Sequence, residues 1–387
     1  MLRGSPRIVL APDKFKGTLS AGEVADCLSA GIRGVLPAAA TRVLPVADGG
    51  DGTLEVALAA EHTLVEVPAA GPRGEPTRVG IATRGSAAVV ELASICGLQE
   101  LADGQLLPER CTTLGLGLAL RAALELGFRR LVVGLGGSAS TDGGAGMLVG
   151  LGARLLDDGG REVPPTPQHL AHTARLDLST LTPAATQTDF TFAVDVDTPL
   201  LGPHGAAHVF GPQKGADPEA VQRLEQAMAR WSRLVQDAIP EADPQAAGAG
   251  AAGGTGFAGL ALGGQLRSGS DLCLDLSGFD EALCQADVVV TGEGRLDAQT
   301  LLGKAPLKVA ARAKAAGLPA IAVVGSRSTE LSDRVLADHG FGRVYALVDE
   351  APGAGQDPAL SRRTLRTIGA RIARDLCQFI PSPSGSE

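Results

Sequence analysis

Four predicted strands each run into a loop that carries one or two carboxylates. The strands lie at 8–11, 43–46, 190–194 and 288–290. The carboxylates that follow them are Asp13, Asp48, Asp51, Asp195, Asp197, Glu293 and Asp297. Ligands of open α/β sheets bind beyond the carboxyl ends of the strands, where carboxylates suit Mg²⁺ binding and activation of a hydroxyl nucleophile. A single such residue is equally well explained as a turn or helix cap, but four loops in one chain favour a shared site.

A glycine-dense segment, 131–146, combines a predicted strand with a loop rich in hydroxyl groups. The strand at 131–135 is followed by Ser138, Ser140 and Thr141 among five glycines, and a helix is predicted to begin near Met147. Backbone N–H groups in such a loop can surround phosphate oxygens, and a following helix N-terminus adds to the attraction. The segment is neither a Walker A loop nor a GxGxxG motif, and glycines also permit close strand–helix packing.

Lysine is scarce in this chain, which makes its positions informative. Only six of the 34 basic residues are lysines, namely Lys14, Lys16, Lys214, Lys304, Lys308 and Lys314. Lys16, Lys214 and Lys304 each stand next to a glycine in a predicted loop. Lysine is a compact point charge suited to phosphate oxygens, whereas arginine requires bidentate geometry. We therefore interpret these three as phosphate ligands, and Lys308 and Lys314, on a predicted helix, as ordinary surface residues.

Strands and helices alternate at both ends of the chain. Near the N-terminus, the strand at 8–11 is followed by a helix that Ser20 and Glu23 open as a capping box, then by the strand at 43–46 and a helix at 54–60. Toward the C-terminus, the predicted elements are strands 288–290, 321–324 and 344–348 and helices 306–316, 331–339 and 360–380. This alternation predicts a parallel sheet with helices on both faces.

The middle of the chain has a different pattern. It begins with short alternating strands, and a long amphipathic helix starts at Asp217-Pro218. The Ala- and Gly-rich segment 246–264 predicts a tight loop and a close-packed helix. The expected fold class is α/β: a doubly wound, Rossmann- or flavodoxin-like domain of 1–83 plus 285–387, with a second mixed α/β domain, 84–284, inserted into it.

Composition excludes several classes of protein. The net charge is −9, and no basic block with interleaved aromatics suggests nucleic-acid binding. Apolar runs such as 114–126 are interrupted by charges, which argues against a membrane span. The first apolar run is only a strand's length and meets Pro12 at once, so we expect no signal peptide and a cytoplasmic location. The six cysteines form no CxxC pair and are expected to be reduced, mostly buried thiols.

Six motifs in order along the chain carry a resemblance to a known family. They lie at 11–21, 47–53, 134–147, 195–202, 211–216 and 291–306. Together they resemble the bacterial glycerate kinase family, with departures at Lys14, Asp51 and Thr141. The resemblance implies ATP-dependent phosphorylation of D-glycerate, a requirement for Mg²⁺ and an active site in the cleft between the two domains.

The motifs also imply roles for individual residues. The expected catalytic residues are Asp195, Asp48, Lys16 and Glu293. The residues expected to bind substrate or phosphate are Asp13, Lys214, Arg295, Lys304, Gly136, Gly137, Ser138, Thr141 and Asp142. Either Asp195 or Asp48 would accept the hydroxyl proton, and the other, with Asp197, would help to hold Mg²⁺. The expected metal ligands are thus Asp195 and Asp197.

Several alternatives remain at this point. Resemblance favours 2-phosphoglycerate as the product, but the sequence leaves open a glycerate 3-kinase or a kinase for another small hydroxy acid. A two-domain protein that binds or senses an organic acid without chemistry is a non-enzymatic alternative, although clustered carboxylates do not favour an anion binder. The loop 134–139 also resembles that of GHMP-type kinases, which the β–α alternation opposes. The expected ligands are glycerate and a nucleotide, and the oligomeric state is open.

Overall fold

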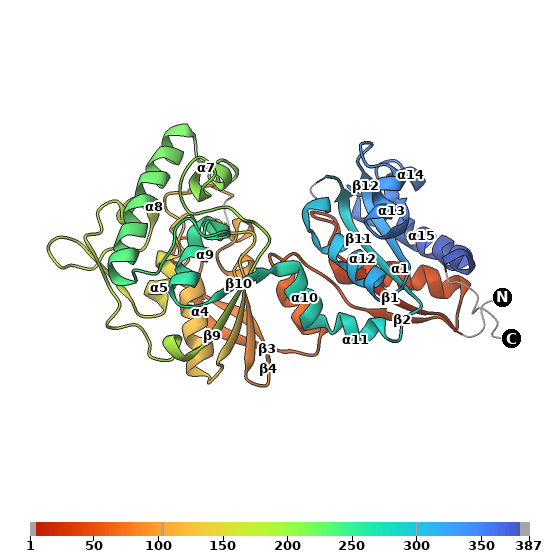
Figure 1. Cartoon of the computed structure of the whole chain (residues 1–387), viewed down its shortest axis with the longest axis horizontal. Helices are drawn as coiled ribbons and strands as arrows, with labels where there is room; N and C mark the ends of the chain where they lie inside the picture. Colours follow the sequence, from red (N-terminus) through yellow and green to blue (C-terminus); the bar gives the residue numbers. More distant parts are fainter. Residues whose placement is uncertain (1–4, 102–103, 299, 380–387) are drawn as a thin grey trace. The chain divides into compact units, whose positions relative to one another are not determined.

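The computed structural model describes residues 5–101, 104–298 and 300–379 (Figure 1). The chain forms two compact units. The first unit comprises Met1–Ala47, Glu55–Ala60 and Ser270–Glu387, and the second comprises Asp48–Leu54 and Glu61–Gly269. Within the described ranges, none of the helices has the length and apolar character that crossing a membrane requires.

The first unit is built on a five-stranded sheet in which every pairing is parallel. Its strand order is β13-β12-β11-β1-β2. The strands are β1 (Arg7–Pro12), β2 (Ala40–Val43), β11 (Val288–Leu296), β12 (Ala320–Arg327) and β13 (Phe341–Ala346). Ile8 pairs with Val288, so the two ends of the chain share one sheet, as the sequence predicts.

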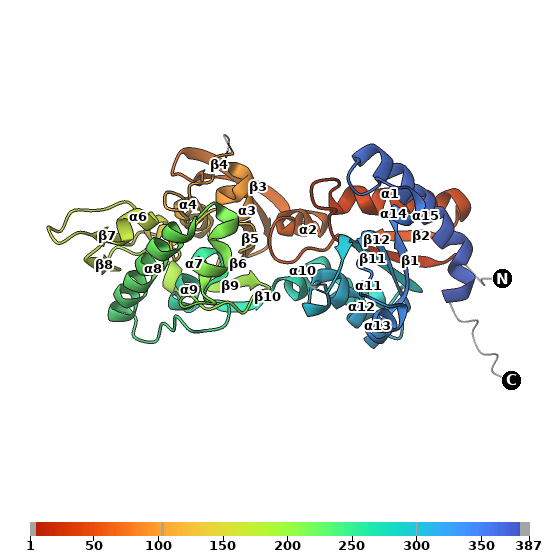
Figure 2. The same cartoon turned by 90° about the horizontal axis from the view of Figure 1, so that it is seen from above.

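Helices cover both faces of this sheet, because the buried strands are apolar on both sides. One face packs Ile8, Val290 and Val323 against α1 (Ala21–Val35) and α15 (Pro358–Phe379). The other packs Val9, Val289 and Val324 against a second set of helices. That set is α10 (Gly269–Ser277), α11 (Phe279–Leu283), α12 (Ala305–Ala315) and α13 (Asp333–Asp338). Figure 2 shows α1 and α15 on one side of the strands and α12 and α13 on the other, which confirms the doubly wound fold.

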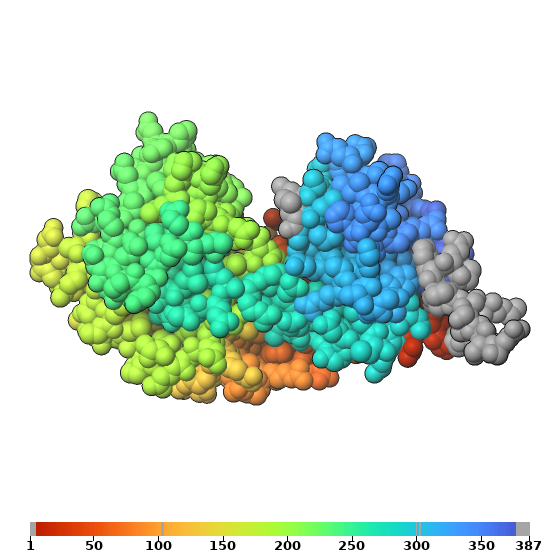
Figure 3. Space-filling model, in the orientation of Figure 1, coloured from red at the N-terminus to blue at the C-terminus, as the bar shows by residue number. Residues whose placement is uncertain are grey.

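Two short helices complete the first unit. They are α2 (Thr53–Ala59), whose residues from Glu55 onward belong to this unit, and α14 (Leu347–Glu350). In the space-filling view, the blue segment that includes α12 and α13 covers one face of the unit (Figure 3). The predicted capping box is present, since Ser20 accepts from the Glu23 N–H and Glu23 accepts from the Ser20 N–H.

The second unit is built on a mixed six-stranded sheet in the order β10-β9-β6-β5-β4-β3. Its strands are β3 (Thr63–Ala70), β4 (Pro76–Arg84), β5 (Ala87–Glu91), β6 (Arg130–Gly134), β9 (Asp189–Val194) and β10 (Gln265–Ser268). The pairs from β5 to β10 are parallel, whereas β3, β4 and β5 form an antiparallel meander. A separate hairpin joins β7 (Arg154–Leu156) and β8 (Arg175–Asp177).

The helices of the second unit pack around a main apolar core that includes Trp231, Phe192 and Phe257, and around a smaller cluster that includes Ala207 and Leu224. They are α3 (Ala93–Cys96), α4 (Leu114–Glu125), α5 (Ala145–Gly150), α6 (Pro167–Leu170), α7 (Ala206–Phe210), α8 (Pro218–Ala238) and α9 (Ala251–Ala261). The helix α8 begins where predicted, with the Asp217 side chain accepting from the Ala220 N–H. The expected mixed α/β character is confirmed.

The unit boundaries differ from those expected at 83/84 and 284/285. Residues 61–83 belong to the second unit, because β4 pairs with β5 along their shared edge. Residues 270–284 belong to the first unit, because Leu274 and Phe279 pack in the core of its parallel sheet. The strand β3 was not predicted; it contains Pro68 and is an edge strand, where proline is tolerated.

The strand expected at 43–46 is also displaced. The structure has β2 end at Val43, and the chain beyond it meets Pro45, which has no backbone N–H to donate to a ladder. β2 is an edge strand, as Pro45 suggests.

Candidate active site

Three loops of the second unit meet backbone to backbone through glycines. A Cβ atom on Gly136 would lie 2.4 Å from Cα of Gly50, and one on Gly49 would lie 2.6 Å from Cα of Gly269. These approaches leave no room for a side chain. The loop after β2, the glycine-rich loop after β6 and the start of α10 therefore converge at one place.

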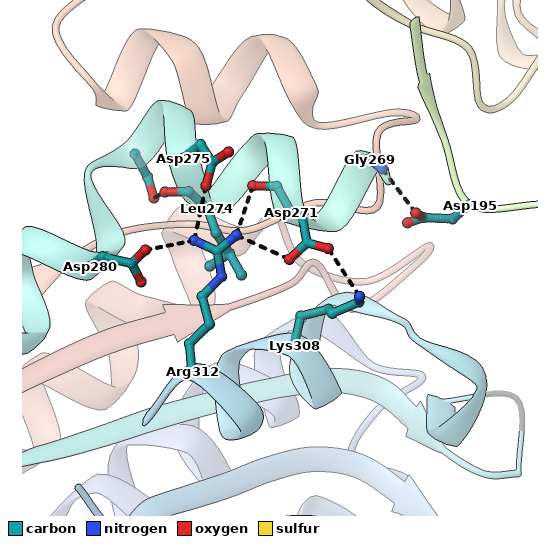
Figure 4. Close-up of polar contacts among 9 residues, drawn as sticks. Asp195, Gly269, Asp271, Leu274, Asp275, Asp280, Lys308 and Arg312 are labelled. Carbon is teal, nitrogen blue, oxygen red and sulfur yellow. Dashed lines mark hydrogen bonds and ion pairs between the residues drawn. The ribbon is translucent and has the colours of Figure 1, made fainter. Parts of the chain in front are cut away.

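Asp48 and Asp195 are brought to this place by the same glycine. The Gly269 N–H donates to Oδ1 of Asp195 at 2.9 Å (Figure 4). A Cβ on Gly269 would lie 2.3 Å from the Asp48 carbonyl oxygen, so the two backbones touch. Asp48 accepts from the Gly50 N–H at 3.1 Å, which is also ordinary turn chemistry. Asp48, Asp195 and Asp197 are all exposed.

The predicted phosphate loop divides into an exposed and a buried part. Gly137 is exposed and Gly136 is half-buried, whereas Ser138 and Thr141 are buried. The Ser138 hydroxyl lies 2.7 Å from that of Ser140 and accepts from the Ser140 N–H. Thr141 Oγ1 is buried without a hydrogen-bond partner among the described residues. The glycines at the start of the loop are thus its accessible part.

Asp142, in the second half of this loop, is fully buried. Its carboxylate accepts from the Thr113 N–H at 2.7 Å and hydroxyl at 2.8 Å, and from the Thr112 hydroxyl at 3.2 Å. The N–H groups of Gly144 and Gly146 donate to it as well. Burial raises the pKa of Asp142, and these hydrogen bonds oppose the rise. Its contacts anchor the loop, a role that the sequence prediction of substrate binding did not include.

Lys214 is also buried in the second unit. Only 3% of the residue is exposed, and its ammonium group donates to the carbonyl oxygen of Ser140. Burial lowers the pKa of Lys214 to about 8, and the charge of Asp142 opposes the shift. Sequence position alone placed Lys214 in an open loop beside phosphate.

In the first unit, the loop after β1 lies beside β11. The Asp13 N–H donates to the Gly292 carbonyl at 2.8 Å, and Oδ1 of Asp13 accepts from the Lys14 N–H. A Cβ on Gly294 would lie 3.5 Å from the backbone nitrogen of Lys16, so the loop and β11 are in contact through their backbones. The Lys16 residue itself is exposed. Lys16 is thus accessible to a ligand.

Glu293 and Arg295 lie inside a strand, not in the loop that was expected. β11 continues to Leu296, and Glu293 is in register with Val324 of β12. The sequence prediction stopped at 290 because Gly292 and Gly294 weaken the strand pattern. Glu293 is buried, whereas Arg295 is exposed, with its Nε 3.6 Å from Oδ2 of Asp297.

Glu293 and Lys304 form a loosely spaced pair. Oε2 of Glu293 lies 4.0 Å from Nζ of Lys304, whose side chain is 39% exposed. Oε1 of Glu293 accepts from the Thr300 hydroxyl at 2.6 Å, and that hydroxyl accepts from the Asp297 N–H. Lys304 also occupies the N-cap position of α12, which begins at Ala305, but its side chain makes no capping hydrogen bond. The bond from Thr300 fixes the Glu293 carboxylate, which in turn lies next to the partly exposed ammonium group of Lys304.

An ion-pair network fixes the helix that begins after Lys304. Arg312 of α12 bonds to Asp271 at 3.0 Å, Asp275 at 2.9 Å and Asp280 at 3.1 Å (Figure 4). Lys308 bonds to Asp271 at 2.9 Å. Burial raises the pKa of Asp271, but hydrogen bonds from Lys308 and Arg312 outweigh this effect and hold it below its usual value.

Sequence reasoning missed residues that support the site. Glu91 is buried at the end of β5 and accepts from the N–H groups of Gly52 and Leu54, which holds the loop that carries Asp48. It is itself an acidic residue at a strand end, so the pattern used for the other carboxylates applied to it. Thr113 bonds to Asp142, 29 residues along the chain, and Thr300 bonds to Glu293 on the strand that precedes it; neither threonine was singled out from the sequence.

The donor set suits a hard cation, although it is sparse. In the part of the chain that the structure describes, His, Cys, Asp and Glu form no group of three or more at metal-binding distance. Mg²⁺ in phosphoryl-transfer sites is held by one or two carboxylates together with substrate phosphates and water. The exposed carboxylates of Asp48, Asp195 and Asp197 therefore fit Mg²⁺ by type, with one or two of them as its ligands.

Comparisons with known proteins agree along almost the whole chain. The sequence model of the glycerate kinase family matches residues 8–377. A glycerate kinase of Bacillus subtilis (strain 168) is 40% identical, covering 97% of this chain and all of the relative. A glycerate 2-kinase of Escherichia coli (strain K12) is 36% identical, covering 95% and 98%. A crystal structure assigned to glycerate kinase 2 of Salmonella typhimurium LT2 has a TM-score of 0.82 at 36% identity, covering 96% of this chain and 98% of that one. The chain therefore belongs to the glycerate kinase family, which makes it a kinase and excludes the non-enzymatic binding or sensor protein.

Proposed function

We propose that this enzyme transfers the γ-phosphoryl group of ATP to D-glycerate and forms ADP and 2-phosphoglycerate. The observation that supports this most directly is the meeting of Asp48 and Asp195 at Gly269, next to the exposed start of the glycine-rich loop. A kinase needs both a group that accepts the hydroxyl proton and donors that surround phosphate.

The carboxylates take the proton and the cation. Asp195 or Asp48 accepts the proton of the attacking hydroxyl, since both carboxylates are exposed and so accessible to a substrate. The other, with Asp197, would hold Mg²⁺, which neutralises phosphate charge when it is bound. Asp13 contributes to substrate binding from the loop after β1.

The phosphate and carboxylate charges are met by basic residues and backbone N–H groups. Gly136 and Gly137 provide the accessible amides of the glycine-rich loop. Lys16, Lys304 and Arg295 are at least partly exposed and serve as cations toward phosphate or the glycerate carboxylate. Glu293 orients Lys304 through the pair described above.

Phosphorylation of the 2-hydroxyl is the finer part of the proposal. It is supported by the name of the Escherichia coli relative, a glycerate 2-kinase. The 3-hydroxyl is the alternative on the same substrate, and another small hydroxy acid is the alternative substrate. A cytoplasmic location belongs to the same proposal, because ATP is the expected phosphoryl donor.

Product identification tests the proposal. The purified enzyme is incubated with ATP, Mg²⁺ and D-glycerate, and the product is examined by phosphorus NMR with authentic 2- and 3-phosphoglycerate as standards. We expect ADP release that depends on glycerate, and the 2-phosphoglycerate signal alone. A 3-phosphoglycerate signal would refute the regiochemistry, and absence of glycerate-dependent ADP release would refute the function.

A further inference from the structure

Lys214 is enclosed by the second unit and reaches a distant loop. It ends the 3₁₀ turn Pro212–Lys214, and Gly215 caps the turn with a φ of 91°. From there its ammonium group donates to the carbonyl oxygen of Ser140, 74 residues away in the glycine-rich loop. The bond therefore links two of the family's motifs inside one unit.

The surroundings of this ammonium group are those of a structural contact. The charged or titratable groups that act on it are Asp142, Cys96 and Cys111. Cys96 and Cys111 are buried thiols whose pKa values burial raises, so they stay neutral near pH 7. Asp142 is the nearby carboxylate, and it is itself buried and hydrogen-bonded. Among the described residues, the buried ammonium group thus donates a hydrogen bond to the Ser140 carbonyl oxygen, and Asp142 is the carboxylate that balances its charge.

The same loop is fastened on its other sides by uncharged contacts. The Trp231 indole N–H donates to the Gly143 carbonyl at 2.9 Å, and the Gly143 N–H donates to the Gly253 carbonyl at 2.9 Å. A Cβ on Gly253 would lie 2.1 Å from the Ser140 carbonyl oxygen, so this turn packs directly against the backbone of the loop. Ala252 there has a φ of 51°, a conformation that costs energy and persists where surrounding structure enforces it.

A lysine that neutralises phosphate must present its ammonium group to the ligand. Lys16 and Lys304 do so in part, whereas Lys214 uses its group on Ser140 within the protein. Burial of an ammonium group is unfavourable unless its hydrogen bonds are satisfied, so this arrangement requires a gain elsewhere. Rigid placement of the phosphate loop is such a gain, because catalysis depends on donors fixed in advance.

We infer that Lys214 is a positioning residue, which holds the Ser140 carbonyl and thereby sets the path of the glycine-rich loop without touching either substrate. The inference rests on the proposed role of that loop in phosphate binding. It separates Lys214 from Lys16 and Lys304, with which it shares only a neighbouring glycine in the sequence.

The test compares Lys214→Met with Lys314→Met. Lys314 also donates to a backbone carbonyl, that of Asp338 at 3.1 Å, but it is exposed and in the first unit, so it is a matched control. Amide hydrogen exchange is measured by mass spectrometry on ligand-free protein, together with kcat and KM for ATP and glycerate. In Lys214→Met we expect faster exchange confined to peptides of 134–146 and kcat lowered at least about tenfold. Lys314→Met should match the wild type in both.

A third variant separates hydrogen bonding from charge. The amide group of Lys214→Gln can still donate to Ser140 but carries no charge, so positioning predicts slower exchange and higher kcat than in Lys214→Met. If Lys214→Met does not fold, Lys214→Gln is compared with the wild type instead. We then expect the amides of 134–146 in Lys214→Gln to remain protected from exchange. A low kcat with wild-type exchange in ligand-free protein would overturn the inference in favour of direct phosphate contact. Unchanged kcat and exchange would also overturn it.

The exchange experiment does not use substrate. A wild-type enzyme that fails to make 2-phosphoglycerate would refute the proposed function while leaving the effect of Lys214 on the loop measurable.

Discussion

Oδ1 of Asp195 accepts a hydrogen bond from the N–H of Gly269 at 2.9 Å, and this bond orients the carboxylate at the end of β9. β10 ends at Ser268, next to β9 in the same sheet, so the contact follows from parallel pairing of the two strands. Because Gly269 also touches the Asp48 backbone, one residue without a side chain places both candidate bases. The two aspartates can therefore be tested as a pair.

Asp195→Asn and Asp48→Asn distinguish the proton acceptor from the cation ligand. Loss of a general base lowers kcat by about 10²- to 10⁴-fold, because the hydroxyl proton has no acceptor in the transition state. We expect one variant to show this loss and the other to show a raised requirement for Mg²⁺. Asp158→Asn, at an exposed residue outside these loops, is the control. Wild-type kcat in both site variants would rule out either aspartate as the base.

Asp197→Asn tests the second expected metal ligand. Asp197 is exposed and two residues from Asp195 on the same loop. Removing a carboxylate weakens Mg²⁺ binding, so the Mg²⁺ concentration needed for half-maximal rate should rise and kcat should fall. Activity is measured over a Mg²⁺ titration at constant ATP. An unchanged titration curve would assign Asp197 to the loop structure.

Gly136→Ala tests the backbone contact between the loops. The added Cβ would lie 2.4 Å from Cα of Gly50, so one loop must move. We expect a loss of about 1–3 kcal/mol in the free energy of unfolding, with a large loss of activity. Gly34→Ala in α1 meets nothing within 4 Å and should stabilise by about 0.5–1 kcal/mol at full activity. Equal behaviour of the two variants would show that the close approach does not constrain the site.

The pH dependence of stability tests the burial of Lys214. Its pKa is about 8 in the folded protein against 10.5 unfolded, so between these values the unfolded chain binds more protons. The contribution of Lys214 to the free energy of unfolding is therefore lowest below pH 8, and it rises by about 3 kcal/mol as the pH approaches 10.5. Chemical denaturation at several pH values should show this rise in the wild type and in Lys314→Met, and a smaller one in Lys214→Met. Parallel curves for all three would contradict a depressed pKa.

Local signals in the sequence predicted the elements well. The strand around Ile8, the capping box at Ser20 and the helix start at Asp217 depend on neighbouring residues only, and the structure confirms them. The parallel sheet followed from β–α alternation, which requires no knowledge of distant contacts. The meeting of Asp48 and Asp195 was expected only in general terms, as part of a site shared by the acidic loops that follow four strands.

Features that depend on distant contacts were not predictable. The edge strand β3 was not predicted, because its pairing with β4 at the edge of the sheet is not a local property of its sequence. Gly292 and Gly294 hid the continuation of β11, which pairing with β12 maintains. The burial of Lys214 depends on Ser140, so a lysine beside a glycine looked the same in the sequence whether open or enclosed.

Lys304→Arg tests whether a lysine at this position is required as a compact charge. Nζ of Lys304 lies 4.0 Å from Glu293 and the side chain is partly exposed, so an arginine can be accommodated without unfolding. If the ammonium group contacts phosphate in the transition state, the planar guanidinium cannot take its place, and kcat should fall by about 10²-fold at native thermal stability. Lys308→Arg, four residues further along α12, is the matched control, because arginine can keep the ion pair with Asp271. Its kcat and melting temperature should equal those of the wild type. Full activity of Lys304→Arg would show that any cation suffices at the start of α12, and the scarcity of lysine in this chain would then carry no information about phosphate binding.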